Sequence, residues 1–444
     1  DVLIHERTPF MKKAADSGRG AVYIASRIFL GSGAVQSPGA VAVSDGVLVA
    51  AGTPRDVERT APSGLVRREF PGAVLLPGLV NAHTHLQIPR LKVPEGAASS
   101  EAFPFVHWIL RIIAWKRGAP PEEYRKNFDA AAAEALASGT TALGEIAGPD
   151  SGVYEFCPLR ARVFAEGIGF HPEAAVEALT VVESALERLE AFAGRAGGLI
   201  FPGVSPHTLY TVGPELLRSL GDLAVQRGIP ACLHLAESPA EMEFLRTGGG
   251  EVASRLYPAV GKDVSWFRGI GMPIREYLEQ AGLLREWLLL VHNVHLTRKE
   301  IGELRKRGAR FVLCPRSNAA HGNGQPDVAH FVDTGIPFAL GTDSLGSVPD
   351  LSVWEEMRAA RSLYRGNLTE AELCRVLFRA ATEYGAASLG LPGGSLRAGR
   401  AADFIVADDP GGDANAAIRN LVDRTGGKNI RLTVVGGTPR HERL

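Results

Sequence analysis

Histidine and acidic residues recur at the carboxyl ends of short apolar runs in this sequence. His83 and His85 end the run that begins at Ala73, His234 ends a second run, and Asp343 follows a third in the stretch GTDS. Alternate residues of a β-strand point to the same side, so His83 and His85 can bind one cation together. Three neutral imidazoles and one carboxylate suit a divalent ion, either Zn²⁺ or Fe²⁺. We predict one such ion, with zinc favoured, which would lower the pKa of a bound water molecule.

These ligands must converge although His83 and Asp343 lie 260 positions apart. Stretches with helical periodicity alternate with short apolar runs, which predicts a parallel sheet with right-handed crossovers. Eight such units predict an α/β fold, a (β/α)8 barrel of the TIM type, in which all strands end at one mouth. The eight runs are AVLLPGLVNA, TTALGEI, ARVFAEGIG, GLIFPGVS, IPACLHLA, WLLLVHNV, ARFVLCP and IPFALGT.

The two ends of the chain have a different character from its middle. Short Val-, Ile- and Ala-rich runs are separated by Gly and Pro, and VSDGVLV is typical of a hairpin with a type I′ turn. We expect residues 1–75 and 392–444 to form one small β-sandwich and residues 76–391 to form the barrel. Residues 87–121 and 238–286 are longer than a barrel unit needs and are expected to form a lid and a cap.

The composition narrows the class of protein. Apolar residues make up 45% and charged residues 22% of the 444 positions, and the net charge is -1. This favours a globular protein with a small-molecule substrate and neither a nucleic acid nor a membrane as partner. The four cysteines are widely spaced and the first eighteen residues do not resemble a signal peptide, so we expect free thiols and a cytoplasmic location.

The motifs at the predicted strand ends resemble those of a known family. PGLVNAHTH, HLAE, VHNVHL, CPRSN and LGTDS are similar to the amidohydrolase superfamily, and within it to the deaminase and chlorohydrolase group with a single metal ion. Binuclear members usually bridge two metals with a carbamylated lysine after the fourth strand. No lysine lies between Lys126 and Lys262, although Glu145 or Glu166 could substitute for it.

The resemblance implies a role for each polar residue at the mouth. Asp343 would bind the metal, take a proton from the water and pass it to the leaving amine. His292 would hydrogen-bond the nucleophile and help to deprotonate it, while Glu237 would protonate the ring nitrogen beside the attacked carbon. His295 is expected to be structural, as are His107, His171 and His330.

Within the group, the sequence most resembles the aminodeoxyfutalosine deaminases. The resemblance implies hydrolysis of 6-amino-6-deoxyfutalosine to futalosine and ammonia, a step toward menaquinone. The substrate carries a carboxyphenyl group, which needs aromatic and cationic contacts. Phe105, Trp108 and Trp115 are candidates for stacking, although Trp108 has the spacing of a core residue. The other candidate substrate contacts are His207, Arg111, Lys116, Arg316, Ser317 and Asn318; Arg316 has an internal ion pair as its alternative.

Other substrates and one non-enzymatic class remain as alternatives. The same chemistry fits a deaminase of S-adenosylhomocysteine, methylthioadenosine or guanine. A dechlorinase of s-triazines is less favoured, because that activity usually departs from Glu at the position of Glu237. A non-catalytic assembly scaffold would be expected to lose metal ligands, and all four positions are filled here. The resemblance also makes a homodimer an expectation.

Overall fold

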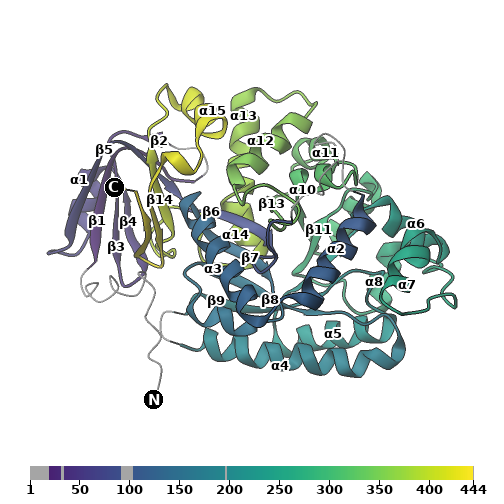
Figure 1. Ribbon diagram of the computed structural model, residues 1–444. Coiled ribbons are helices and arrows are strands. Elements are labelled where there is room, and N and C mark those ends of the chain that lie inside the picture. The colour runs from purple at the N-terminus through teal and green to yellow at the C-terminus, as the bar shows by residue number, and fades with distance from the viewer. Residues whose placement is uncertain (1–19, 32–34, 92–103, 196–197, 444) are drawn as a thin grey trace, which may run out of the picture.

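The computed structural model describes residues 20–31, 35–91, 104–195 and 198–443 (Figure 1). Its larger part is a ring of eight strands in which each neighbouring pair is parallel. The ring closes where Thr84 pairs in parallel with Asp343. The predicted barrel is therefore confirmed, and its strands are β6 Leu79–Thr84, β7 Thr140–Ile146, β8 Arg160–Gly167, β9 Ile200–Pro206, β10 Ala231–Leu235, β11 Leu288–His292, β12 Arg310–Leu313 and β13 Phe338–Leu340.

Helices surround the ring and return the chain to the start of each next strand (Figure 1). Helix α5 shows the local signals clearly, since Pro214 begins it and Gly228, at φ 63°, ends it in the left-handed region. The inner faces of the strands meet in an apolar core that includes Val80, Cys232 and Val291. The outer helices are α3 Pro121–Ala137, α4 Ala175–Ala193, α5 Pro214–Arg227, α9 Arg298–Lys306, α11 Val328–Asp333, α12 Val353–Leu363, α13 Glu370–Ala380 and α14 Glu383–Leu389.

Both chain ends contribute to a second, smaller sheet, which confirms the predicted arrangement. Strand β14 pairs antiparallel with β5, so the yellow and purple strands of Figure 1 lie side by side. Residues 45 and 46 connect β3 and β4 with φ angles of 52° and 76°, which confirms the type I′ turn. The strands are β1 Ala21–Phe29, β2 Val35–Gln36, β3 Gly39–Ser44, β4 Val47–Gly52, β5 Val66–Pro77, β14 Phe404–Asp408, β15 Ile430–Val435 and β16 Thr438–Glu442, with helices α1 Pro54–Thr60 and α15 Ala414–Arg424.

The first predicted barrel strand, AVLLPGLVNA, proves to be two strands. Its first half belongs to β5, where Pro77 pairs with Phe404 of the small sheet, and its second half is β6. Gly78 makes the transfer between sheets, and a Cβ there would lie 2.1 Å from the hydroxyl oxygen of Thr141. The close approach of Thr141 explains why residue 78 is a glycine. The break between β5 and β6 was not predicted, because the sequence is apolar on both sides of it. Strand β5 thus spans the proposed boundary between residues 75 and 76.

The predicted lid and cap both contain helices. Helix α2 Phe105–Gly118 lies in the lid segment, and the cap segment holds α6 Pro239–Thr247, the π-helical turn η4 Val252–Leu256, α7 Tyr257–Ala259 and α8 Ile274–Gln280. A contact between His107 and the guanidinium of Arg255 joins the two segments. Residues 92–103 of the lid and residues 1–19 lie outside the described part of the chain.

All four cysteines are buried and free, as predicted: Cys157, Cys232, Cys314 and Cys374. Among the helices of the described ranges, none has the length and apolarity needed to cross a membrane.

Candidate active site

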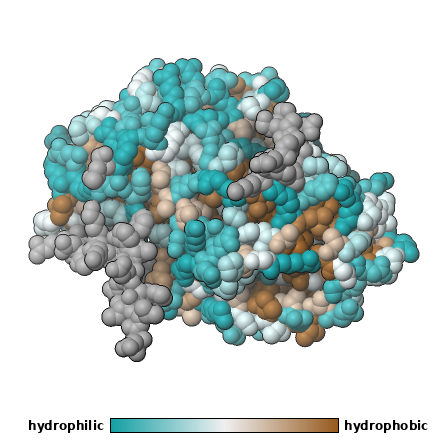
Figure 2. Space-filling view, in the orientation of Figure 1, coloured by the Kyte–Doolittle hydropathy of each residue, from teal (hydrophilic) through white to brown (hydrophobic). Residues whose placement is uncertain are grey.

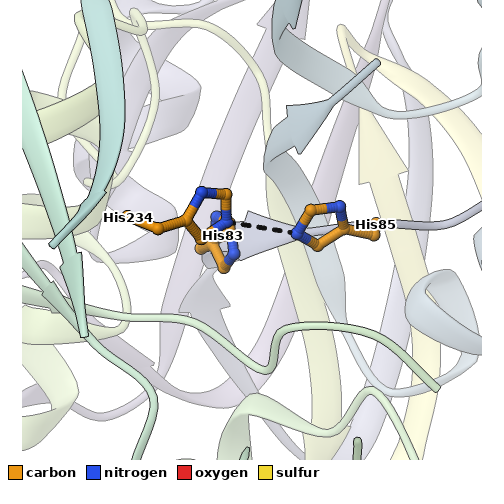
Figure 3. Close-up of side chains that lie close together, drawn as sticks. All are labelled: His83, His85 and His234. Atoms are coloured by element: carbon orange, nitrogen blue, oxygen red, sulfur yellow. Dashed lines mark hydrogen bonds between the residues drawn. The ribbon is translucent and has the colours of Figure 1, made fainter. Parts of the chain in front are cut away.

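Three histidines converge at the mouth of the barrel. His83 and His85 come from the end of β6 and His234 from β10, and their ligand nitrogens all lie within 4.8 Å of one another. The Nε2 atoms of His85 and His234 are 3.4 Å apart, and the three rings turn toward a common point (Figure 3). The sequence predicted that these residues would converge, and they do so because β6 and β10 end at the same mouth of the barrel.

The chemistry of this cluster fits a divalent cation. Both ring nitrogens of His83 are buried and have no hydrogen-bond partner among the described residues, which is costly unless a ligand satisfies them. Burial, followed by the neighbouring imidazoles, lowers the pKa of His83 and His85 well below the usual range and that of His234 to about 4. The rings are therefore neutral at pH 7, as metal ligation requires. His234 also hydrogen-bonds through Nδ1 to the carbonyl oxygen of His207 at 2.8 Å, which directs its Nε2 to the cluster.

A carboxylate completes the set of predicted ligands. Asp343 Oδ1 lies 3.6 Å from His85 Nε2 and 3.8 Å from His83 Nε2. Its second oxygen, Oδ2, accepts hydrogen bonds from the hydroxyls of Ser317 at 2.7 Å and Ser347 at 2.8 Å. Burial raises the pKa of Asp343 to about 6, and the two hydroxyl donors oppose that rise. Oδ1 is thereby the oxygen presented to the histidines.

Glu237 and His292 form a second polar pair beside the cluster. Glu237 Oε2 lies 3.8 Å from His292 Nε2. Burial first, and then the nearby carboxylates of Asp343 and Glu241, raise the pKa of Glu237 well above its ordinary value. Burial lowers the pKa of His292 well below its ordinary value. Both shifts favour the uncharged forms, a carboxylic acid and a neutral imidazole, which can exchange hydrogen bonds with a bound ring.

Backbone strain gathers at these strand ends. Ala236, His292, Asn293 and Asp343 all have φ between 52° and 74°, a region that side chains other than glycine seldom adopt. Such residues cost on the order of 1–3 kcal/mol each and persist where surrounding contacts enforce them. One such contact is Glu241, whose carboxylate accepts the N–H groups of residues 236 and 237 at 2.9 and 2.8 Å.

A cavity of about 410 Å³ opens beside these residues. Its walls are largely apolar, and hydrophobic surface gathers near α2 on the face shown in Figure 2. Two ammonium groups, those of Lys116 and Lys262, line it, and neither has an ion pair within the described ranges. Lys116 lies close enough to Glu166 to lower the pKa of that buried carboxyl, which desolvation raises. The apolar lining includes Ile88, Phe105, Trp108, Ile109, Ile112, Ile113, Phe170, Leu256, Tyr257 and Val260.

The predicted substrate contacts divide into two groups. Phe105, Trp108, His207 and Lys116 line the cavity, and so does His171, which was expected to be structural. Arg316 instead pairs with Asp350 at 2.9 Å and Glu356 at 3.6 Å, so the geometry supports its internal alternative. The members of the second group lie outside the cavity lining: Arg111, Trp115, Arg316, Ser317 and Asn318.

Ser317, Asn318 and Trp115 have identifiable partners elsewhere. Ser317 donates to Asp343, and Asn318 contacts His292 Nδ1 at 3.1 Å. Trp115 donates its indole N–H to Glu123 at 3.1 Å. The CPRSN motif therefore lies behind the polar residues of the mouth, where it contacts them directly.

A second ion would have an incomplete set of ligands. Glu166, His207 and His234 form another close group, but His234 already belongs to the first. The nearby Lys116 ammonium lowers the pKa of His207, with burial the larger cause, and opposes a second positive charge. Glu145 is engaged elsewhere, accepting hydrogen bonds from Thr84, Leu86 N and Tyr154. The geometry favours a single-ion centre.

Several residues of the site escape detection in the sequence. Glu241 follows Glu237 by four positions and reads as an ordinary first-turn helix carboxylate. Asn323 donates its amide to Glu237 Oε1 at 3.3 Å, and Ser347 donates to Asp343. The only local signal is the stretch HGNG around Asn323, whose glycines and asparagine indicate a tight turn. Their roles depend on side-chain directions that no local pattern fixes.

The fold and this site define a class of protein. Residues 74–440 match the amidohydrolase family, and the chain belongs to it. The family is metal-dependent, and the expectation of a hydrolytic enzyme is thereby confirmed.

The chain is also similar to individual proteins. It is 34% identical over 379 residues to an aminodeoxyfutalosine deaminase of Deinococcus radiodurans, covering 81% of this chain and 83% of that protein. It is 30% identical over 379 residues to a 5-methylthioadenosine/S-adenosylhomocysteine deaminase of Natronomonas pharaonis, with 82% and 81% covered. The crystal structure of an adenosine deaminase from Xanthomonas campestris with bound zinc superposes with a TM-score of 0.77 at 26% identity, over 95% of this chain and 92% of that one.

Proposed function

We propose that this protein is a zinc-dependent aminohydrolase that replaces the 6-amino group of an adenine nucleoside by oxygen. The observation that carries the proposal is the Glu237–His292 pair, 3.8 Å apart, beside three histidines and Asp343 at one mouth. Deamination of a cyclic amidine needs an acid for the ring nitrogen and a base for the water, and both are present. The zinc-containing relative supports the choice of metal over iron.

The ion would be held by His83, His85, His234 and Asp343, and when bound it supplies a water of lowered pKa. Asp343 Oδ1 faces that position and accepts the proton of the water, because Oδ2 is already engaged. Glu237, whose burial favours the protonated form, donates to the ring nitrogen next to the attacked carbon. The leaving amine then takes the proton that Asp343 holds, and the added hydroxyl group returns its proton to Glu237 as the carbonyl forms.

We propose 6-amino-6-deoxyfutalosine as the substrate. The largely apolar cavity can enclose an aromatic group, and Lys116 and Lys262 offer cations to a carboxylate. The similarity to the Deinococcus radiodurans aminodeoxyfutalosine deaminase points the same way. The product would be futalosine, for menaquinone synthesis in the cytoplasm, where the four free thiols would stay reduced.

A second candidate is a deaminase of methylthioadenosine or S-adenosylhomocysteine. The observation in its favour is the same apolar lining, which also suits a thioether, together with 30% identity to a relative of that activity. Guanine is disfavoured, because a free base would leave much of the 410 Å³ cavity unfilled. Dechlorination is disfavoured by Glu237.

The test is a substrate panel on the zinc-loaded protein. Aminodeoxyfutalosine, S-adenosylhomocysteine, methylthioadenosine, adenosine and guanine would be compared by ammonia release and by the ultraviolet shift from adenine to hypoxanthine. We expect the highest kcat/KM for the carboxyphenyl nucleoside and none for Asp343→Asn. If a thioether nucleoside were preferred, the proposed reaction would stand and the proposed substrate would be wrong. If no compound released ammonia, the proposed function would be refuted.

A further inference from the structure

One short segment contacts all three reacting side chains of the site. It comprises α10 Pro315–Ala320 and the turn that follows. Ser317 Oγ donates to Asp343 Oδ2 at 2.7 Å, Asn318 Nδ2 lies 3.1 Å from His292 Nδ1, and Asn323 Nδ2 donates to Glu237 Oε1 at 3.3 Å. All three side chains are buried, with exposures of 0%, 0% and 1%.

Each of these contacts occupies one of the two polar atoms that the partner possesses. The atoms left over are Asp343 Oδ1, His292 Nε2 and Glu237 Oε2. They are the atoms that face the centre of the site, since Oδ1 lies 3.6 Å from His85 Nε2, and Nε2 and Oε2 lie 3.8 Å from each other. One segment thereby selects which atom of each partner is free to react.

The contact to His292 also bears on where its proton lies. With Asn318 Nδ2 facing His292 Nδ1 at 3.1 Å, the amide N–H donates to a ring nitrogen that carries no proton, which places the proton of the neutral imidazole on Nε2. Asn323 donates to Glu237 Oε1, which leaves Oε2 as the carboxyl oxygen that faces His292. His292 then presents an N–H to the reacting oxygen and cannot accept a proton at Nε2.

We propose that Ser317, Asn318 and Asn323 are positioning residues that fix which atom of each partner faces the centre, and that Asn318 makes His292 a hydrogen-bond donor through Nε2, leaving Asp343 as the base. This deepens the proposed function and rests on it. It changes the role that the family resemblance implied for His292, which was to help deprotonate the nucleophile. The turn is itself held, because Asn323 N–H donates to Asn318 O at 3.0 Å and His295 Nε2 contacts Asn323 O at 2.7 Å.

The direct test is nitrogen NMR of the zinc-loaded protein labelled with 15N-histidine. The resonances of His292 would be assigned by their loss in His292→Gln. We expect a protonated Nε2 and a bare Nδ1 in the wild type, without any substrate present. A proton on Nδ1 would overturn the proposal. The tautomer is read from the wild-type protein, so the test does not depend on whether variants of Ser317, Asn318 or Asn323 fold.

Two variants extend the test to catalysis. In Asn318→Asp the new carboxylate accepts a proton from His292 Nδ1, so we expect the tautomer to reverse and kcat to fall about 10²-fold with KM nearly unchanged. Asn323→Asp removes the donor to Glu237, and kcat should fall while the zinc content stays the same. The matched control is Asn367→Asp in an exposed loop, which should keep the wild-type kcat.

Either variant with wild-type kcat would contradict the proposal. Failure of the proposed function has a different signature: the wild-type spectrum would show the expected tautomer, but no nucleoside would release ammonia. The tautomer is measured without substrate, so the two failures are distinguishable.

Discussion

Glu237 is the residue on which the proposed deamination depends most. A metal centre alone can supply a nucleophile, but an aromatic amidine loses its amine only when the ring nitrogen is protonated. The burial of Glu237, together with the carboxylates of Asp343 and Glu241, raises its pKa and so favours the protonated form that an acid needs. Asn323 donates to Oε1, so that Oε2 is the oxygen that faces His292.

We therefore expect Glu237→Gln to lower kcat by roughly 10²–10⁴-fold, the range for loss of a general acid. Glutamine is isosteric, so KM and bound zinc should change little. Steady-state kinetics and metal analysis would measure this. The control is Glu243→Gln on the exposed face of α6, which should behave as the wild type. Equal activity of the two variants would exclude Glu237 as the acid.

At the scale of elements, α2 forms one wall of the cavity. It contributes Phe105, Trp108, Ile109, Ile112, Ile113 and Lys116 to the lining. Five of these side chains are apolar or aromatic, and the sixth ends in a charge. We expect this element to distinguish substrates by their distal group, because the proposed reaction takes place elsewhere, at the strand ends.

Lys116→Met should consequently change substrate preference. A lost charge-assisted contact is worth about 1.5–3 kcal/mol, which predicts a rise in KM of at least roughly tenfold for the carboxylate-bearing nucleoside. Methylthioadenosine has no anionic group, and its KM should stay the same. Competition kinetics with both substrates would measure the ratio. Lys299→Met, at a side chain 84% exposed on α9, is the control. A parallel change in both KM values would argue against a carboxylate contact.

Helices α10 and α12 meet through a buried carboxyl group. Glu356 is fully buried and accepts the backbone N–H of Arg316 at 3.2 Å. Burial raises the pKa of Glu356 to about 8, although the guanidinium of Arg316, 3.6 Å away, opposes the rise. Burial is the larger effect, so the folded protein holds a proton there that the unfolded chain releases near pH 4.5.

The stability of the protein should therefore depend on pH through Glu356. Between about pH 4.5 and 8 the folded state binds more protons than the unfolded state, so the free energy of unfolding falls as pH rises. One such group contributes at most about 1.4 kcal/mol per pH unit. Glu356→Gln should remove this contribution, and melting temperatures measured at several pH values would show a smaller decline than in the wild type. Identical slopes would contradict the assigned pKa.

The strands were the part of the fold most accessible from sequence. Thr140–Ile146 is predicted with its observed ends, because a short run of β-forming and apolar residues is bounded by Gly139 and by a loop with Gly, Pro and Asp. The break at Pro77–Gly78 could not be predicted in this way. Both sheets bury their strands, so apolarity continues across the transfer and only tertiary pairing separates β5 from β6.

The site was predictable to the extent that its residues end strands. His83, His85, His234 and Asp343 follow from that rule, because the barrel brings all strand ends to one mouth. Contacts that depend on side-chain direction did not follow. Arg316 was a candidate for the substrate carboxylate, yet it turns toward Asp350 and Glu356.

At the scale of the whole molecule, one buried ion pair joins the barrel to the small sheet. Arg160 of β8 contacts Asp403 through two hydrogen bonds of 2.5 and 3.1 Å, and both side chains are buried. Asp403 also accepts the N–H of Gly436 at 2.7 Å, while its carbonyl oxygen accepts that of Gly78. The carboxyl-terminal segment is thus tied to the point where the chain enters the barrel.

Removal of this charge should destabilise the protein without altering catalysis. Asp403→Asn leaves a buried guanidinium without its counter-charge, which costs about 3–5 kcal/mol. We expect a clearly lower melting temperature and an unchanged kcat at a temperature where the variant is folded. Glu442→Gln breaks the exposed pair with Arg68 and should cost under about 1 kcal/mol. If the two variants lowered the melting temperature equally, the Arg160–Asp403 pair would not be a main contact between the barrel and the small sheet.

The central claim is that this site hydrolyses an amino group on a ring with a metal-activated water. The most direct measurement is turnover of aminodeoxyfutalosine by the zinc-loaded protein in ¹⁸O-labelled water. We predict one labelled oxygen in the product for each ammonia released, and loss of both after the metal is removed by a chelator. Product that lacks the label, or turnover that persists without metal, would contradict the account.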